Sequence, residues 1–262
     1  MADHFLFPDY DHIYLSPHLD DVALSCGGRI HQQTARGERV LVVTICAGDP
    51  PGGPLSDFAQ ELHDRWALRR SAPELRRAED LAALELLGAK ALHLSVPDCI
   101  YRRDGARGSH LYDSREAIFG PLHPDDWHLS LDVTSTLENC GTPRSDAHLY
   151  APLSIGNHVD HQLTWRIADD WAGTHSNLFF YEDYPYAHDR SLVTRWIEGR
   201  SWTPEITPLA EADFKQKLKA IAQYRSQLGT FWPDEAAMAA ALRGHAASVA
   251  GGEGMAERVW KA

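Results

Sequence analysis

The residues with the clearest capacity for chemistry lie close to the N-terminus. One histidine, His18, and two adjacent carboxylates, Asp20 and Asp21, follow a short apolar segment and are themselves followed by small residues. Imidazole and carboxylate are ligands that suit a catalytic divalent metal, zinc first among them. A strand expected at 12–15 would present these side chains at its carboxyl end, so we expect the chemistry of the protein to take place there.

A catalytic metal site of this type needs a further protein ligand, because such sites typically use three and leave a fourth position for water. The best distant candidates are His158 and His161, which lie three residues apart. If a helix begins near position 157 or 158, this spacing places both imidazoles on one face of the helix. We therefore expect the two histidine-bearing segments to meet around one cation.

Together these segments resemble the PIG-L or LmbE-like zinc N-deacetylases, which carry His-x-Asp-Asp after the first strand and His-x-x-His further on. The two motifs stand here at 18–21 and 158–161, and the resemblance covers roughly residues 10 to 185. It implies that His18, Asp21 and His161 bind the metal. It also implies that Asp20 is the general base, and that His158 stabilises the tetrahedral oxyanion or donates a proton.

The function that the resemblance implies is removal of an acetyl group from an N-acetylated amino sugar or a related sugar-containing small molecule. Zn²⁺ is the implied cofactor, although the same ligands accept Fe²⁺ or cobalt. Hydrolysis of another amide, such as a thiol-conjugate amide, and a non-catalytic sugar-binding role stay open. A nucleotide-binding protein is disfavoured, because no Gly-x-Gly-x-x-Gly follows the first strand.

Three further positions are candidates for the site. The resemblance implies that positions such as Arg77 and Asp98 contact substrate groups in some members of the family. A helix-surface ion pair is the alternative for Arg77, and a loop turn is the alternative for Asp98. Asp160 either orients a ligand imidazole or caps the helix, and the sequence does not decide between the two.

The chain departs from the family pattern at three positions near these motifs. Leu19 replaces a frequent proline and Val22 a frequent glutamate, and neither residue is a metal ligand. Some members place a tyrosine two residues before the first histidine of His-x-x-His, where this chain has Gly156. A tyrosine at that position therefore cannot stabilise an oxyanion here.

The elements that must position these residues alternate between strand and helix. Apolar, β-branched runs predict strands near 12–15, 39–46, 91–96, 148–152 and 178–181, and helical patterns are expected at 22–36, 58–70, 73–87, 132–139 and 162–171. This alternation predicts an α/β, Rossmann-like three-layer fold with a mostly parallel sheet and helices on both faces. Ligands of such sheets bind at the carboxyl ends of the strands.

The organisation of the whole chain is simple. We expect a single domain over 1–262, with a C-terminal helical extension from about 209 that includes helices at 213–226 and 236–250. The segment 102–130 lacks clear periodicity and contains several glycines and prolines. A segment of that kind is often a functional loop or lid.

Composition excludes several classes of protein. A net charge of -12 without a basic block argues against nucleic acid as a partner. No apolar run of 18 residues and no signal-peptide pattern are present, which predicts a cytoplasmic protein without a membrane span. A small-molecule N-acetylated sugar is the partner that the family resemblance implies. The four cysteines form no Cys-x-x-Cys pair, which argues against a zinc ribbon. Assembly as a homo-oligomer stays open.

Overall fold

A computed structural model describes residues 7–65, 72–173 and 177–262. Its centre is one seven-stranded sheet with the order β3-β2-β1-β4-β5-β7-β6. Strands β1 to β5 pair with one another in parallel, and β7 pairs antiparallel with both β5 and β6. The strands are β1 (His12–Ser16), β2 (Val40–Thr44), β3 (Lys90–His93), β4 (His148–Pro152), β5 (Leu178–Tyr181), β6 (Thr203–Pro208) and β7 (Ala256–Lys261). The predicted mostly parallel sheet is confirmed.

Both faces of the sheet are apolar, because its central strands are buried on both sides. Every residue of β1 and β2 is buried. Successive side chains of a strand point to opposite faces, so Tyr14 and Val42 belong to one apolar cluster whereas Ile13 and Leu41 belong to another. Each cluster needs a layer of helices to cover it.

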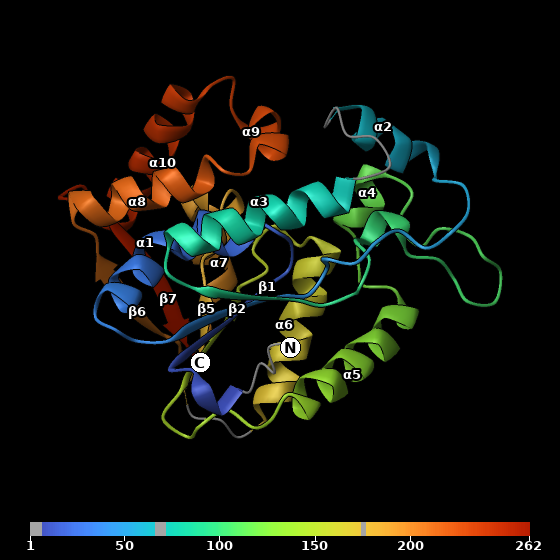
Figure 1. Cartoon of the computed structure of the whole chain (residues 1–262), viewed down its shortest axis with the longest axis horizontal. Coiled ribbons are helices and arrows are strands. Elements are labelled where there is room, and N and C mark those ends of the chain that lie inside the picture. Colours follow the sequence, from blue (N-terminus) through green and yellow to red (C-terminus); the bar gives the residue numbers. More distant parts are fainter. Residues whose placement is uncertain (1–6, 66–71, 174–176) are drawn as a thin grey trace.

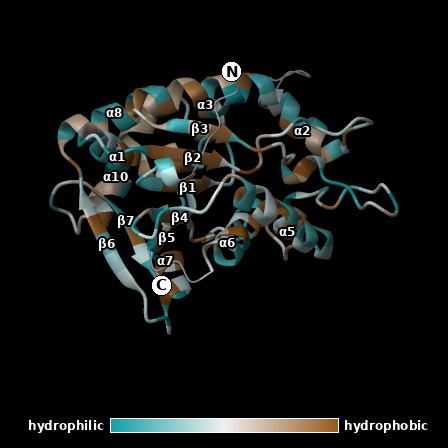
Figure 2. Ribbon diagram, turned by 60° about the horizontal axis from the view of Figure 1, so that its bottom comes forward, coloured by the Kyte–Doolittle hydropathy of each residue, from teal (hydrophilic) through white to brown (hydrophobic). Residues whose placement is uncertain are grey.

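Helices cover the two faces and complete the predicted three layers (Figure 1). One face is covered by α1 (Asp21–Ala35), α3 (Ala72–Leu86), α8 (Glu211–Ile221) and α10 (Glu235–Val249). The other is covered by α5 (Pro124–Asn139), α6 (Val159–Ala172) and α7 (Arg190–Ile197). Figure 2 shows the apolar strands enclosed between these helices. The three-layer α/β fold is confirmed.

The C-terminal region differs in part from the expectation. Helices α8, α9 (Arg225–Phe231) and α10 do follow position 209, but the chain then returns to the sheet as β7. Neither β6 nor β7 is among the predicted strands. Strand β6 is polar, contains two prolines and is largely exposed, so it lacks the apolar alternation that marks a half-buried strand.

The segment after β2 and the segment 102–130 both contain short helices. Helix α2 spans Asp57–Arg65, and the remainder of the helix predicted at 58–70 lies outside the described residues. The segment 102–130 contains α4 (Arg115–Ile118) and the start of α5, eight residues before the predicted start at 132. Pro124 begins α5 because its missing N–H costs nothing in the first turn, and the His123 Nδ1 accepts a hydrogen bond from the Asp125 N–H.

None of the helices in the described ranges is long and apolar enough to cross a membrane.

Candidate metal and catalytic site

The turn between β1 and α1 brings the first two candidate ligands together. Strand β1 ends at Ser16, whose hydroxyl donates a hydrogen bond to the His18 carbonyl (2.6 Å). Helix α1 begins at Asp21, and Asp21 Oδ2 accepts a hydrogen bond from the His18 backbone N–H (2.9 Å). The same oxygen lies 3.0 Å from His18 Nδ1. The short turn therefore holds imidazole and carboxylate in contact.

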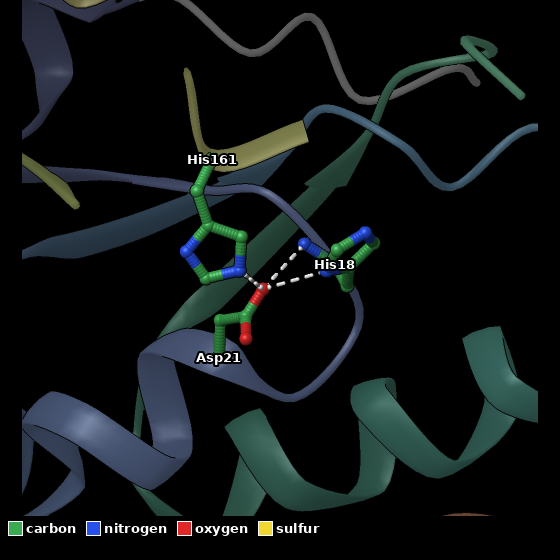
Figure 3. Close-up of side chains that lie close together, drawn as sticks. All are labelled: His18, Asp21 and His161. Carbon is green, nitrogen blue, oxygen red and sulfur yellow. Dashed lines mark hydrogen bonds and ion pairs between the residues drawn. The ribbon is translucent and has the colours of Figure 1, made fainter. Parts of the chain in front are cut away.

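The third candidate ligand comes from the first turn of α6. His161 Nε2 lies 3.4 Å from Asp21 Oδ2, and Figure 3 shows His18 and His161 on either side of that carboxylate. The ligand atoms of the three buried side chains all lie within 4.8 Å of one another. Tetrahedral zinc with bonds of about 2.1 Å separates its ligand atoms by about 3.4 Å. The donor set and its spacing therefore fit a divalent cation such as zinc.

The electrostatics of these three residues favour the charged form of each. The two histidines favour a positive charge, and Asp21 favours a negative one. Burial alone would lower the pKa of His161, but the carboxylates of Asp21 and Asp183 outweigh it and raise this pKa to about 9. Burial likewise opposes the charge on His18, whose pKa is nevertheless raised by Asp21 and Asp160. The two histidines in turn hold the pKa of Asp21 well below its usual range, against the effect of burial. A bound cation would supply the same positive charge.

Two further carboxylates fix the orientation of the candidate histidine ligands. Asp183 Oδ2 lies 2.9 Å from His161 Nδ1, and Asp160 Oδ2 lies 2.9 Å from His18 Nε2. The N-cap of α6 is His158, so Asp160 orients an imidazole and does not cap the helix. Sequence reasoning missed Asp183. The available signal was its place as the second acidic residue after a predicted strand end.

Asp20 stands apart from these contacts. It occupies the N-cap position of α1, yet its side chain makes no capping hydrogen bond. Burial raises the pKa of Asp20 to about 6, with Asp21 adding to the effect and Arg76 opposing it. The nearest Arg76 nitrogen is 3.9 Å from Asp20 Oδ1. The carboxylate is therefore not committed to the helix and is available for proton transfer.

His158 presents a neutral imidazole. Its Nδ1 accepts a hydrogen bond from the Asp160 backbone N–H (3.2 Å), so the proton of the neutral ring is on Nε2. Burial lowers the pKa of His158 to about 3, and the neighbouring His18 acts in the same direction. The rings of His158 and His18 lie edge to face, 5.0 Å apart. His158 thus offers a hydrogen-bond donor beside the candidate ligands.

One cavity of about 670 Å³ joins most of the predicted site residues, namely His18, Asp20, Asp21, Asp98, His158 and His161. Asp98 Oδ2 lies 3.9 Å from His18 Nε2, and its Oδ1 accepts a hydrogen bond from the Ile100 N–H. Of the residues predicted for the site, Arg77 and Asp160 lie outside this lining, and the others line one space.

Arg77 is not brought to this cavity. Its guanidinium donates hydrogen bonds to the Ala47 carbonyl (2.8 Å) and to Asp49 (3.0 Å). The preceding residue, Arg76, lines the cavity instead. Successive residues of an α-helix point about 100° apart, so a difference of one position along α3 decides which arginine reaches the site.

A tyrosine that sequence reasoning did not select also lines the cavity. The ring of Tyr186 is packed so closely on Gly156 that a Cβ there would lie 2.3 Å from Tyr186 Cγ. The same ring stands edge to face against His161, with centroids 5.5 Å apart. Gly156 therefore leaves space that a tyrosine from the segment after β5 occupies.

The fold and the site define a Rossmann-like α/β protein whose candidate metal ligands gather at the carboxyl ends of parallel strands. The family model described as "PIG-L: GlcNAc-PI de-N-acetylase" matches residues 13–172, and the chain belongs to this family. The resemblance predicted from the two histidine motifs is confirmed.

Individual relatives agree with this assignment. The chain is similar to the 2'-N-acetylparomamine deacetylase of Niallia circulans, with 27% identity over 239 residues that cover 86% of this chain and 83% of that protein. For the enzyme of the same name from Streptomyces fradiae, identity is 29% over 222 residues, covering 82% and 72%. The solved "zinc inhibited form of teicoplanin deacetylase Orf2" has a TM-score of 0.78 and 28% identity, covering 95% of this chain and 96% of that one.

Proposed function

We propose that this protein is a metal-dependent N-deacetylase that hydrolyses the acetamide of an N-acetylated amino sugar, with zinc as its metal. The observation that carries the proposal is the shared cavity, which is lined by the candidate ligands His18, Asp21 and His161 together with Asp20 and His158. The names of the similar 2'-N-acetylparomamine deacetylases support an amino sugar as the substrate.

The roles of the residues follow from their positions. His18, Asp21 and His161 would hold the metal, which when bound supplies Lewis acidity and a more acidic water. Asp20 takes a proton from the water that attacks the acetyl carbonyl carbon. His158 Nε2–H donates a hydrogen bond to the carbonyl oxygen as negative charge develops there, a contribution of about 3 kcal/mol to the transition state. Asp20 then delivers its proton to the departing nitrogen, so acetate and a free amine are formed.

The experiment compares acetate release from 2'-N-acetylparomamine by the parent protein, by Asp20→Asn and by Asp64→Asn. Asp64 is an exposed carboxylate on the same chain and serves as the control. We expect Asp20→Asn to lower kcat by about 10²- to 10⁴-fold while its zinc content equals that of the parent. Parental turnover in Asp20→Asn would remove Asp20 from the mechanism.

A further inference from the structure

A second cavity lies among α5, α6 and α7, the helices that cover one face of the sheet (Figure 2). Its volume is about 460 Å³, which falls within the range of sites that enclose small molecules. It shares no lining residue with the candidate catalytic cavity. The loop between β4 and α6 separates the two spaces, with His158 lining the catalytic cavity and Ser154 and Asn157 lining the second one.

Three tryptophans form the broad walls of this second cavity. Trp127 belongs to α5, Trp165 to α6 and Trp196 to α7, so the three rings come from separate helices. Trp127 is 50% exposed, which leaves much of its ring uncovered. Aromatic rings pack favourably against other flat rings. The walls therefore favour a ligand with a planar ring.

The charge of the lining is positive. Its charged residues are two arginines, and the lining within the described ranges contains no Asp, Glu or His. Arg200 Cζ lies 3.8 Å from the centroid of the Trp196 ring. Arg166 Cζ lies 5.3 Å from the centroid of the Trp127 ring. A guanidinium that stacks on a ring is held in place and still offers N–H donors in its own plane, which suits a flat oxyanion.

The two arginines differ in how far their charge is already matched. Arg166 Nε donates a hydrogen bond to Ser130 Oγ (3.1 Å) and lies 3.8 Å from Asp170 Oδ2. Arg200 is exposed and has no carboxylate within ion-pair distance in the part of the chain that the structure describes. Arg200 therefore has the most to gain from an anion that enters the cavity.

Two buried polar groups of the lining lack a partner among the described residues. Ser154 is only 8% exposed, and its hydroxyl forms no hydrogen bond there. The indole N–H of Trp165 is likewise buried without an acceptor. Buried polar groups nearly always have partners, and rotation about one bond redirects the Ser154 hydroxyl. Both groups can donate, so a ligand that carries oxygen atoms would supply what is missing.

We propose that this second cavity binds a small aromatic anion, which is a planar ring that carries a carboxylate or phosphate group. The ring packs against the tryptophan walls, and the oxyanion accepts hydrogen bonds from Arg200 and Arg166. Ser154 and Trp165 donate to further oxygen atoms of the ligand. The inference goes beyond the proposed deacetylation and does not depend on it, because none of these residues is assigned to that reaction.

The experiment titrates the metal-loaded parent with benzoate, phenyl phosphate and the neutral benzamide, and follows the quenching of tryptophan fluorescence. Three of the eight tryptophans line the second cavity, and none is among the described residues that line the catalytic one. We expect at least one anion to bind about tenfold more tightly than benzamide, because hydrogen bonds between charged groups are about twice as strong as neutral ones. Equal binding of all three compounds, or binding of none, would overturn the inference.

Arg200→Gln assigns the binding to this cavity. The variant should weaken binding of the preferred anion by about five- to tenfold, because it removes the charge of the donor. Arg195→Gln, exposed on α7 but outside the lining, is the matched control and should bind as the parent does. Parental affinity in Arg200→Gln would place the anion elsewhere, such as at the metal, and would refute the assignment.

Ser154→Ala tests the buried hydroxyl. We expect the affinity for the preferred anion to fall by about threefold or more, because one donor to the ligand is lost. Ser145→Ala, at an exposed position outside the lining, should keep the parental affinity. Parental affinity in Ser154→Ala would contradict the contact between Ser154 and the ligand.

Discussion

Each candidate histidine ligand contacts an orienting carboxylate through one ring nitrogen. Its other ring nitrogen faces a neighbouring candidate ligand. His18 uses Nε2 toward Asp160 and His161 uses Nδ1 toward Asp183, which leaves His18 Nδ1 and His161 Nε2 directed at Asp21. A carboxylate in such a position fixes both the tautomer and the orientation of an imidazole. At the scale of single residues, the site is thus built from pairs in which one member orients the other.

Asp183→Asn tests this orientation at His161. The variant removes the charged acceptor for His161 Nδ1, so we expect metal affinity to fall by about 10- to 100-fold. Zinc competition with a chromophoric chelator measures the change. Asp169→Asn, an exposed position on α6, should bind zinc as the parent does. An unchanged affinity in Asp183→Asn would show that His161 needs no such partner.

Gly156→Ala tests the contact with Tyr186. Because the added Cβ would lie 2.3 Å from the tyrosine ring, we expect a loss of about 1–3 kcal/mol in the free energy of unfolding, together with reduced deacetylation. Gly244→Ala is the control, since nothing lies within 4 Å of a Cβ there. Gly244 lies on the exposed face of α10. Because glycine is less favourable than alanine inside a helix, Gly244→Ala should stabilise the protein by about 0.5–1 kcal/mol. Equal stability of the two variants would contradict the packing of Tyr186 on Gly156.

At the scale of elements, the site depends on a buried ion network between α5, α6 and the segment that follows β3. Arg102 contacts Asp160 on α6 (2.5 Å) and Asp126 on α5 (2.9 Å), and Tyr112 donates a hydrogen bond to Asp126 (2.7 Å). Asp160 in turn holds His18. One arginine therefore links α5, through Asp160 of α6, to a candidate metal ligand.

Arg102→Met should be strongly destabilising. It leaves the buried carboxylates of Asp126 and Asp160 without their cation, which typically costs about 3–5 kcal/mol in the free energy of unfolding. Urea denaturation measures the change, and the exposed Arg107→Met should lie within about 0.5 kcal/mol of the parent. A stable Arg102→Met variant would show that the two acids are neutral or hydrated in the folded protein.

Elements with strong apolar patterns were predictable, and those without were not. The run of β2 is apolar or β-branched throughout, which is typical of a strand buried on both faces, and it was predicted correctly. Strand β6 is polar and exposed, and β7 joins the sheet by pairing with β6 and with β5, which lies about 80 positions earlier. Such pairing depends on tertiary contacts that a local pattern does not contain.

The candidate site was partly predictable for a similar reason. Short motifs identified His18 and His161, because their ligand chemistry is visible in residue type and spacing. Asp183 and Tyr186 come from one segment after β5, and their roles depend on which side chains the fold places opposite them. Arg76 and Arg77 are chemically identical, so only the rotation of α3 distinguishes them.

At the scale of the whole molecule, a buried histidine in the C-terminal helices makes the free energy of unfolding depend on pH in the acid range. His245 of α10 is buried, and burial together with Lys217, Arg190 and His188 lowers its pKa to about 3. The unfolded chain binds a proton at this residue near its ordinary pKa of 6.5, whereas the folded chain does not. The stability that His245 contributes is therefore present above pH 6.5 and is lost as the pH falls toward 3.

His245→Phe should make the free energy of unfolding less dependent on pH between 6.5 and 3, because the variant has no proton to bind there on unfolding. Urea denaturation at several pH values measures the slope. His128→Gln, at an exposed position, should keep the slope of the parent. An identical slope in His245→Phe would show that His245 is protonated in the folded protein.

The most direct test of the account is the zinc content of the parent, Asp20→Asn and His161→Ala, measured by mass spectrometry after chelation and reloading. We expect about one zinc per chain in the parent and in Asp20→Asn, because three protein ligands are retained, and a large loss in His161→Ala. Parental zinc content in His161→Ala would contradict the claim that His18, Asp21 and His161 hold one metal.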